Sequence, residues 1–144
     1  LTTGHKHINW FFAKSPVGFL VWFDKTKQSP SNIAHLCKSE LVLIYGKVYE
    51  RFAWDTLEIQ QPRGDGLREL HTCPKPIELW EKILEVQKSA RVVYEPFSGS
   101  GTTLIACERL GRKCRAVEIS PAYCAVAIQR WVDVTGNEPV LLDT

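Results

Sequence analysis

Apolar residues along this chain fall into short runs, separated by polar segments that contain proline and glycine. Two continuous apolar runs, 19–23 and 41–45, occupy the first third and are rich in aromatic and branched side chains. Runs of this length and composition, bounded by turn residues, are typical of buried strands. The segment 60–75 has no periodic apolar pattern, and we expect it to form a long mobile loop.

From residue 76 onward the apolar pattern alternates between helical and extended periods. Pro76 suits the first position of a helix, in which Ile77, Trp80 and Leu84 recur at helical spacing until the pattern ends before Ser89. The elements expected after this helix are a strand over 91–94, a helix over 102–110 that stops at Gly111, a strand over 114–118, a helix capped by Ser120 and Pro121 that runs through Trp131, and a further strand over 139–142.

Strand, glycine turn, helix and strand in this order form a βαβ unit. Such units have right-handed crossovers and a parallel sheet. The pattern therefore predicts an α/β fold in one domain over 1–144, with a mostly parallel sheet flanked by helices, and a ligand-binding βαβ region over 76–144.

The turn after the strand at 91–94 is rich in glycine. Gly99 and Gly101 let the backbone approach a ligand closely because no Cβ stands in the way. The next strand ends at Glu118, 17 positions after Gly101 (118 − 101). This is near the offset of roughly 20 residues at which an acid grips ribose hydroxyls in nucleotide-type sites. The alternatives are that the turn only connects a strand to a helix and that Glu118 is only a solvated residue at a strand end. Together, the turn and the acid favour a site for an adenosine-containing cofactor over these alternatives.

The turn lacks the signs of a phosphate-binding loop. Gly101 is followed by Thr102, Thr103 and Leu104, so the third glycine of the dinucleotide fingerprint is absent, and no lysine stands where a triphosphate loop needs one. Pyrophosphate and triphosphate ligands are less favoured for this reason. A nicotinamide-dependent oxidoreductase stays open as an alternative that rests only on the general glycine turn.

Composition narrows the class of protein further. Lys and Arg number 18 against 16 Asp and Glu, too even a balance to indicate a polyanion partner by itself. Five cysteines occur without the paired spacing of metal sites, so we expect no metal, reduced thiols that pack as small apolar residues, and a cytoplasmic location. No apolar run reaches the roughly 20 residues needed to span a bilayer, and no signal-peptide layout is present, so no membrane partner is expected.

Residues 95–103, Glu-Pro-Phe-Ser-Gly-Ser-Gly-Thr-Thr, resemble the Asp-Pro-Phe-x-Gly-Ser-Gly-Thr-Thr cofactor motif of bacterial and phage DNA amino-methyltransferases. Residues 71–76 look like the His-Pro-Thr-x-Lys-Pro element that precedes this motif in the class whose cofactor motif lies near the C-terminus. The similarity continues from 110 to 131, and more loosely upstream in the two apolar runs. The resemblance implies a partial Rossmann-like methyltransferase fold, with S-adenosylmethionine as the cofactor.

The resemblance also assigns residues to the cofactor site. It implies that Glu118 holds the ribose, and that Thr72 and Lys75 lie near the methionine carboxylate, although Lys75 can equally be a solvated lysine at a helix start. The sequence departs from the family pattern at Glu95, where Asp is usual, at Thr72, where Pro is usual, and at Cys73, where Thr is usual. The remaining cofactor residues lie in the turn itself, namely Glu95, Phe97, Ser98, Gly99, Ser100, Gly101 and Thr102.

The catalytic loop of this family has no counterpart in the chain. The family uses an Asp/Asn/Ser-Pro-Pro-aromatic loop, which accepts hydrogen bonds from the amine of a flipped base. The dipeptides Ser15-Pro16 and Ser29-Pro30 lack the second proline and the aromatic residue of this loop, so no catalytic residue is assigned. Because the chain starts at Leu1 and contains no methionine, we expect that loop to lie upstream or on a second polypeptide, and the isolated chain to be inactive.

Two interpretations of the whole chain follow. In the first, it is the cofactor-binding part of an enzyme that, when complete, methylates the exocyclic amino group of adenine or cytosine in DNA. In the second, it is a truncated, non-catalytic methyltransferase module that binds cofactor only. Aromatic and basic residues interleave between Lys6 and Lys27 and can contact nucleic acid, but Trp22 and Phe23 fit a strand core better.

Overall fold

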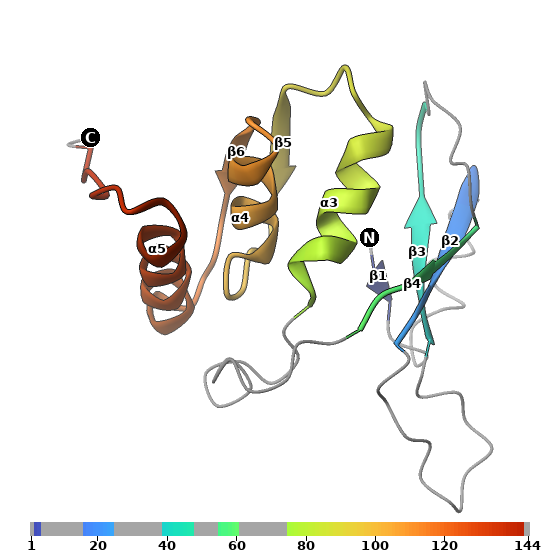
Figure 1. Cartoon of the computed structure of the whole chain (residues 1–144), viewed down its shortest axis with the longest axis horizontal. Coiled ribbons are helices and arrows are strands. Elements are labelled where there is room, and N and C mark those ends of the chain that lie inside the picture. Colours follow the sequence, from blue (N-terminus) through green and yellow to red (C-terminus); the bar gives the residue numbers. More distant parts are fainter. Residues whose placement is uncertain (1, 4–15, 25–38, 48–54, 61–74, 143–144) are drawn as a thin grey trace, which may run out of the picture. The chain divides into compact units, whose positions relative to one another are not determined.

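The computed structural model describes residues 2–3, 16–24, 39–47, 55–60 and 75–142, and the chain divides into two compact units (Figure 1). The first unit spans Leu1–Pro62 and the second Arg63–Thr144. Most of the expected loop at 60–75 and the aromatic and basic residues between positions 6 and 14 lie outside the described residues. Within the described part, no helix is both long and apolar enough to span a membrane.

The first unit contains a four-stranded mixed sheet. Its strand order is β1-β3-β2-β4, in which β3 pairs antiparallel with both β1 and β2, and β4 pairs parallel with β2. The two apolar runs of the sequence form the two longest strands, which confirms both predicted strands. The strands are β1 (Thr2–Thr3), β2 (Gly18–Phe23), β3 (Ser39–Ile44) and β4 (Thr56–Glu58).

Most buried apolar residues of the first unit lie on one face of this sheet, whereas Leu43 lies on the other. Trp22 is 1% exposed, and its indole Nε1 donates a hydrogen bond to the carbonyl oxygen of Ile59 at 3.0 Å. Phe19, in the same apolar run, is 53% exposed, so the run is not buried on both faces. The pleat of a strand sends successive side chains to opposite faces, and an unbroken apolar run hides that alternation. The buried apolar residues here are Leu20, Trp22, Val42, Leu43, Leu57 and Ile59.

The second unit contains the predicted βαβ arrangement. β5 and β6 lie parallel and side by side, with Val92 opposite Lys113 and Glu95 opposite Ala116 (Figure 1). α4 connects the two strands and packs against β6, α3 packs against α4, and α5 follows β6. The elements are α3 (Ile77–Val86), β5 (Val92–Glu95), α4 (Thr102–Arg109), β6 (Lys113–Ala116) and α5 (Pro121–Thr135).

Helix boundaries follow the signals in the sequence closely. Ser120 caps α5, since its hydroxyl accepts a hydrogen bond from the backbone N–H of Tyr123 at 3.5 Å, and Pro121 is the first helical residue. Gly111 adopts the left-handed conformation predicted for it, with φ of 64°. Pro76 is the N-cap of α3 rather than its first residue, because its ψ of 139° is extended. α5 continues four residues beyond Trp131 to Thr135, and Gly136 caps it with φ of 68°.

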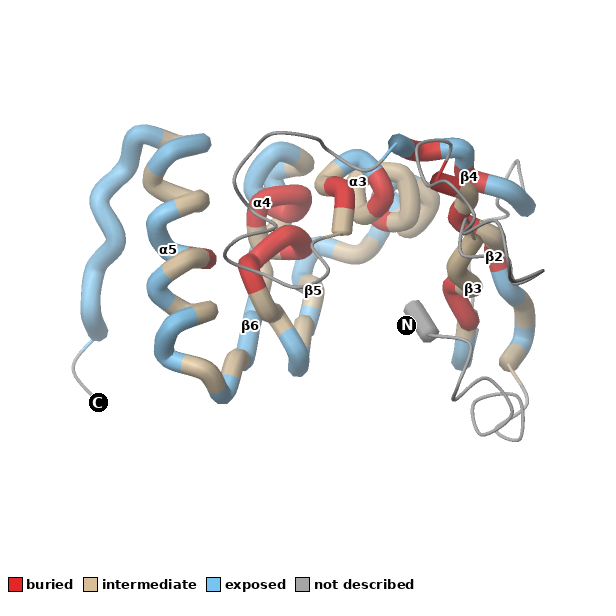
Figure 2. The backbone as a smooth tube through the Cα atoms, turned by 90° about the horizontal axis from the view of Figure 1, so that it is seen from below, coloured by how far each residue is buried: buried red, intermediate tan, exposed pale blue. Residues whose placement is uncertain are grey.

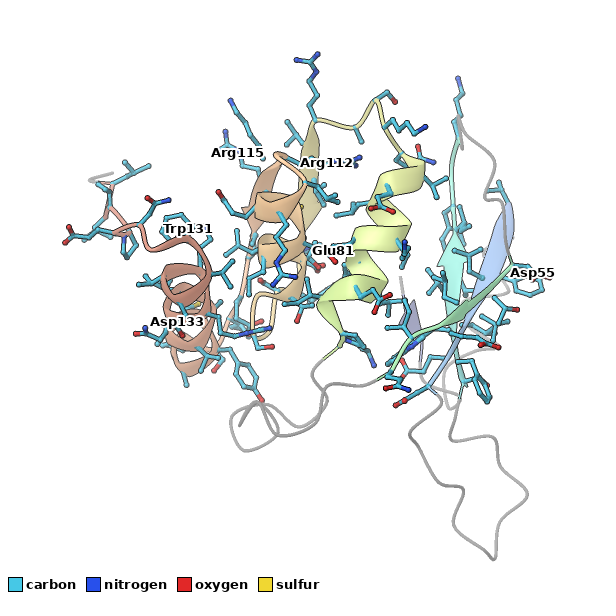
Figure 3. The ribbon with its side chains drawn as sticks, viewed as in Figure 1. Asp55, Glu81, Arg112, Arg115, Trp131 and Asp133 are labelled. Carbon is cyan, nitrogen blue, oxygen red and sulfur yellow. The ribbon has the colours of Figure 1, made fainter. Side chains whose placement is uncertain are left out.

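α4 contributes more buried residues than either α3 or α5, and they appear in red in Figure 2. Ile105 and Ala106 are 1% and 0% exposed. α3 and α5 flank α4 and are tied to it by polar contacts, from Arg109 to Glu81 at 3.3 Å and from the indole of Trp131 to Glu108 at 3.1 Å (Figure 3). Leu84, Ala106 and Cys107 form one buried cluster, against which Ile77, Trp80, Val93, Leu110 and Cys114 pack.

The strand predicted over 139–142 does not form. Val140, Leu141 and Leu142 are 79%, 91% and 79% exposed, and residues 136–142 have no regular secondary structure. A strand is stable only when a neighbour satisfies its backbone groups and covers its apolar face. In the described residues β5 and β6 form a two-stranded sheet that does not include this segment. The apolar run alone was therefore not sufficient to predict a strand.

Candidate functional site

The carboxylate of Glu95 closes the turn that follows β5. Its Oε1 accepts a hydrogen bond from the backbone N–H of Phe97 at 3.0 Å, and its Oε2 accepts one from the hydroxyl of Thr103 at 2.9 Å. Thr103 is only 4% exposed, so its hydroxyl needs a partner within the protein. Glu95 therefore links the end of β5 to the first turn of α4. Its role toward the amino-acid end of a cofactor stays a prediction.

Glu118 makes the equivalent link after β6. Its Oε2 accepts a hydrogen bond from the backbone N–H of Gly99 at 2.7 Å, and its Oε1 accepts one from the backbone N–H of Ser120 at 2.9 Å. The contact with Gly99 joins residues that lie 19 positions apart in the chain. The acid identified by its spacing from the glycine turn thus lies directly against that turn.

Backbone hydrogen bonds continue the pairing of β5 and β6 up to this point. Val117 N–H donates to the carbonyl of Glu95 at 2.9 Å, and Ser98 N–H donates to the carbonyl of Val117 at 3.0 Å. The two carboxylates and the glycine turn therefore meet at the carboxyl ends of two parallel strands. Ligands of open α/β sheets bind at this edge. The structure brings together the predicted turn residues and Glu118, although they come from separate segments of the sequence.

The conformation and packing of the turn give its glycines a reason that adds to the predicted approach of a ligand. Gly99 and Gly101 have φ of 54° and 78°, which side chains other than glycine rarely adopt. A Cβ at position 101 would lie 2.7 Å from the Cβ of Ala127 in α5. The packing of α5 against the turn thus excludes a side chain at Gly101, and the close approach of a ligand to these glycines stays a prediction.

Two large apolar side chains lie exposed beside the two carboxylates. Phe97, two residues after Glu95, is 80% exposed, and Ile119, next to Glu118, is 97% exposed. Apolar side chains of this size are usually at least partly covered in a folded protein, so a pair of them at a strand edge is informative. Phe97 was among the predicted cofactor residues. Ile119 was not among them. Its position directly after Glu118, the residue predicted to bind the ribose, is the sequence signal that could have identified it.

The remaining predicted site residues divide between described and undescribed parts of the chain. Thr72 lies outside the described residues, so its expected role stays a prediction. Lys75 is half-buried directly before Pro76, the cap of α3. Ser100 and Thr102 are buried, at 3% and 6% exposed. Across the described ranges, no group of three or more His, Cys, Asp or Glu side chains could hold a metal ion.

Two cysteines of the second unit, Cys107 and Cys114, fit a packing role. Cys107 in α4 is fully buried, and burial raises the pKa of its thiol. Burial also raises the pKa of Cys114 in β6 to about 12. Both groups are therefore protonated at neutral pH, whereas the thiolate is the form that attacks electrophiles and binds metals. This agrees with the expected role as small apolar residues, while Cys37 and Cys73 lie outside the described residues.

Known proteins that are similar in sequence match less than half of the chain. The chain is 34% identical over 61 residues to the type II methyltransferase M.HindIII of Haemophilus influenzae, which covers 42% of this chain and 20% of that protein. It is 35% identical over 48 residues to the type II methyltransferase M.SmaI of Serratia marcescens, which covers 33% of this chain and 16% of that protein. The matched segments are thus a small part of these longer proteins.

Solved methyltransferase structures share the fold over most of the chain. A complex of M1.HpyAVI with SAM superposes with a TM-score of 0.71 at 24% identity, covering 90% of this chain and 72% of the other. The PvuII DNA methyltransferase, described as cytosine-N4-specific, superposes with a TM-score of 0.62 at 21% identity, covering 82% of this chain and 51% of the other. These superpositions show an α/β, Rossmann-like methyltransferase fold.

The family assignment rests on a match that extends beyond the glycine turn. The sequence pattern of the DNA methylase family N6_N4_Mtase matches residues 5–129 of the 144. The match therefore includes both units, the glycine turn and most of α5. The chain belongs to this DNA methylase family.

Proposed function

We propose that this chain binds S-adenosylmethionine at the carboxyl ends of β5 and β6 and forms the cofactor-binding part of a DNA methyltransferase. The observation that carries the proposal is the contact between Glu118 and the glycine turn. This contact holds the Oε2 atom of Glu118 2.7 Å from the backbone nitrogen of Gly99, in the turn that follows β5. A carboxylate oxygen can accept more than one hydrogen bond, so the contacts of Glu118 with N–H groups do not exclude ribose hydroxyls.

The residues around this turn fit an adenosylated amino acid better than a dinucleotide. Phe97 and Ile119 offer exposed apolar surfaces of the kind that a purine ring requires. The turn lacks the third glycine of the dinucleotide fingerprint, and its second glycine packs against Ala127. In the bound state Glu118 would hold the ribose, and the residues of the turn, Glu95 to Thr102, would face the remainder of the cofactor. S-adenosylmethionine would supply a methyl group carried on a sulfonium.

The proposed reaction is methyl transfer to the exocyclic amine of adenine or cytosine in DNA. The lone pair of such an amine is delocalised into the base, and acceptors at the amine are needed to localise it. The 144-residue sequence does not contain the Asp/Asn/Ser-Pro-Pro-aromatic motif that supplies these acceptors in the family. We therefore propose that a further segment or a second polypeptide supplies them, that DNA is bound by the complete enzyme, and that the enzyme acts in the cytoplasm.

Calorimetric titration of the chain with S-adenosylmethionine, S-adenosylhomocysteine and NAD tests the cofactor. We expect both adenosylated amino acids to bind more tightly than NAD, because the turn lacks the features that hold a pyrophosphate. Tighter binding of NAD would overturn the proposal.

A radiolabelled methyl-transfer assay on mixed-sequence DNA tests the reaction. We expect no transfer by the isolated chain, and transfer when a polypeptide carrying an Asp-Pro-Pro-Tyr-like loop is added. Transfer by the chain alone would contradict the requirement for a second part. Cofactor binding without transfer in either sample would favour the non-catalytic interpretation.

A further inference from the structure

Arg130 of α5 reaches across to the glycine turn and was not among the residues predicted for the site. Its Nη1 donates to the hydroxyl oxygens of Ser100 at 3.1 Å and of Thr102 at 3.4 Å, and also to the backbone carbonyl of Ser100. Both acceptor residues are almost fully buried, at 3% and 6% exposed. Hydrogen bonds from a guanidinium to buried oxygens are among the stronger polar contacts in proteins.

These contacts hold a backbone that is unusual in shape. Ser100 lies between Gly99 and Gly101, whose φ angles of 54° and 78° place two left-handed residues within three positions. Glycine is the residue with the most conformational freedom, so such a turn stays fixed only if its surroundings hold it. Ala127, one helical turn before Arg130 on α5, contacts the turn at Gly101. One face of α5 therefore supports the turn both by packing and by hydrogen bonds.

Helix electrostatics do not account for an arginine at this place. Thr102 is the first residue of α4, and the amino end of a helix carries a partial positive charge that repels cations. Arg109 provides the contrast, because it lies in the last turn of the same helix, where a cation is favourable, and forms an ion pair with Glu81 at 3.3 Å. An unfavourable charge that persists at a helix start is typical of a functional position.

We propose that Arg130 is a positioning residue for cofactor binding, which acts by fixing the turn from Ser98 to Thr102. The inference rests on the proposed function. Arg130 holds Ser100 and Thr102 from the side of α5, while Glu118 holds Gly99 by its N–H. With both sides fixed, the turn meets the cofactor already ordered, so binding does not have to order it.

Three variants of the full chain test this proposal: Arg130→Ala, Arg130→Lys and, as a matched control, Arg109→Ala. The first readout is the dissociation constant for S-adenosylhomocysteine by calorimetry. We expect Arg130→Ala to weaken binding about tenfold or more, the effect of losing charged hydrogen bonds. Arg130→Lys keeps the charge but not the planar fork, so its affinity should lie between those of Arg130→Ala and the wild type. Arg109→Ala should bind as the wild type does.

The second readout is amide hydrogen exchange of residues 99–103 in the chain without cofactor. We expect faster exchange in Arg130→Ala at these amides and unchanged exchange in α3, because the hydrogen bonds from Arg130 to the turn end at Ser100 and Thr102. Guanidinium added at millimolar concentration should partly restore the affinity of Arg130→Ala, which a variant with a merely damaged fold would not show.

The outcomes separate this inference from the proposed function. If the wild type prefers NAD, the proposed function fails, whereas the exchange experiment still decides whether Arg130 orders the turn. If the wild type binds S-adenosylhomocysteine and folded Arg130→Ala binds it within twofold, Arg130 is not a positioning residue. Unchanged exchange at residues 99–103 overturns the proposal in either case.

Discussion

The glycine turn at 97–103 and the C-terminal segment at 139–142 belong to the same unit and differ in what holds them. In the turn, Glu95 and Glu118 accept hydrogen bonds from the turn's own groups at 2.7–3.0 Å. In the segment, Leu141 is 91% exposed and its apolar neighbours are little better covered. The turn gets its partners from residues within one βαβ unit. A strand needs the edge of another strand, which the segment does not find.

The largest effect on the turn is expected from Gly101→Ala. The left-handed backbone costs an alanine about 1–2 kcal/mol, and the overlap with Ala127 adds about 1–3 kcal/mol of overpacking. Gly111→Ala at the other end of α4 is the matched control, since its φ is 64° and nothing lies within 4 Å of the added Cβ. Urea unfolding should show a clearly larger loss of stability for Gly101→Ala. Equal losses would mean that α5 does not pack closely on the turn in solution.

A smaller but more specific effect is expected from Glu118→Ala on cofactor affinity. The variant removes the acceptor proposed for the ribose and the anchor of Gly99, so affinity for S-adenosylhomocysteine should fall by about 1.5–3 kcal/mol. Glu108→Ala removes a carboxylate of α4 that accepts a hydrogen bond from the indole of Trp131, and this variant should bind the cofactor as the wild type does. Unchanged affinity in a folded Glu118→Ala chain would exclude the ribose role.

Thr103→Val tests the second carboxylate link with a nearly isosteric change. The hydroxyl of Thr103 bonds to Glu95 at 2.9 Å in a buried position, and its loss should lower the free energy of unfolding by about 1 kcal/mol. In Thr135→Val the lost hydroxyl donates to the Trp131 carbonyl within its own helix and accepts from the backbone N–H of Asn137. The first contact adds little to helix stability, and the second is exposed to water, which can replace it. The loss in Thr135→Val should be the smaller of the two. The reverse order would show that Glu95 does not hold α4.

Much of the second unit could be predicted because its signals are local. Gly111 and the Ser120-Pro121 pair identify helix ends within a residue or two, since capping depends on the residues at the cap itself. The spacing of Glu118 from the glycine turn predicted a meeting at one strand edge, and the 2.7 Å contact with Gly99 agrees with it.

Other features depend on residues far away in the chain and gave no local signal. Arg130 reaches Ser100 across 30 positions, and nothing in the residues around Arg130 distinguishes it from a surface arginine. Gly101 faces Ala127 rather than open space, a contact that requires the packing of α5. The mixed pairing of β2 with β3 and β4 likewise depends on the whole sheet, whereas an apolar run predicts a strand without its partners.

The smallest effect is expected at the C-terminal segment, in Leu141→Asp. A residue that is 91% exposed and makes no strand pairing contributes little to stability. The free energy of unfolding, measured with urea, should therefore change by no more than about 0.5 kcal/mol. Leu79→Ala, at 0% exposed in α3, is the reference for a buried leucine and should lose about 2–5 kcal/mol. A loss above about 1 kcal/mol in Leu141→Asp would show that the segment packs in solution. The apolar run at 139–142 would then have packing partners, as the glycine turn has, and the contrast between the two regions would no longer hold.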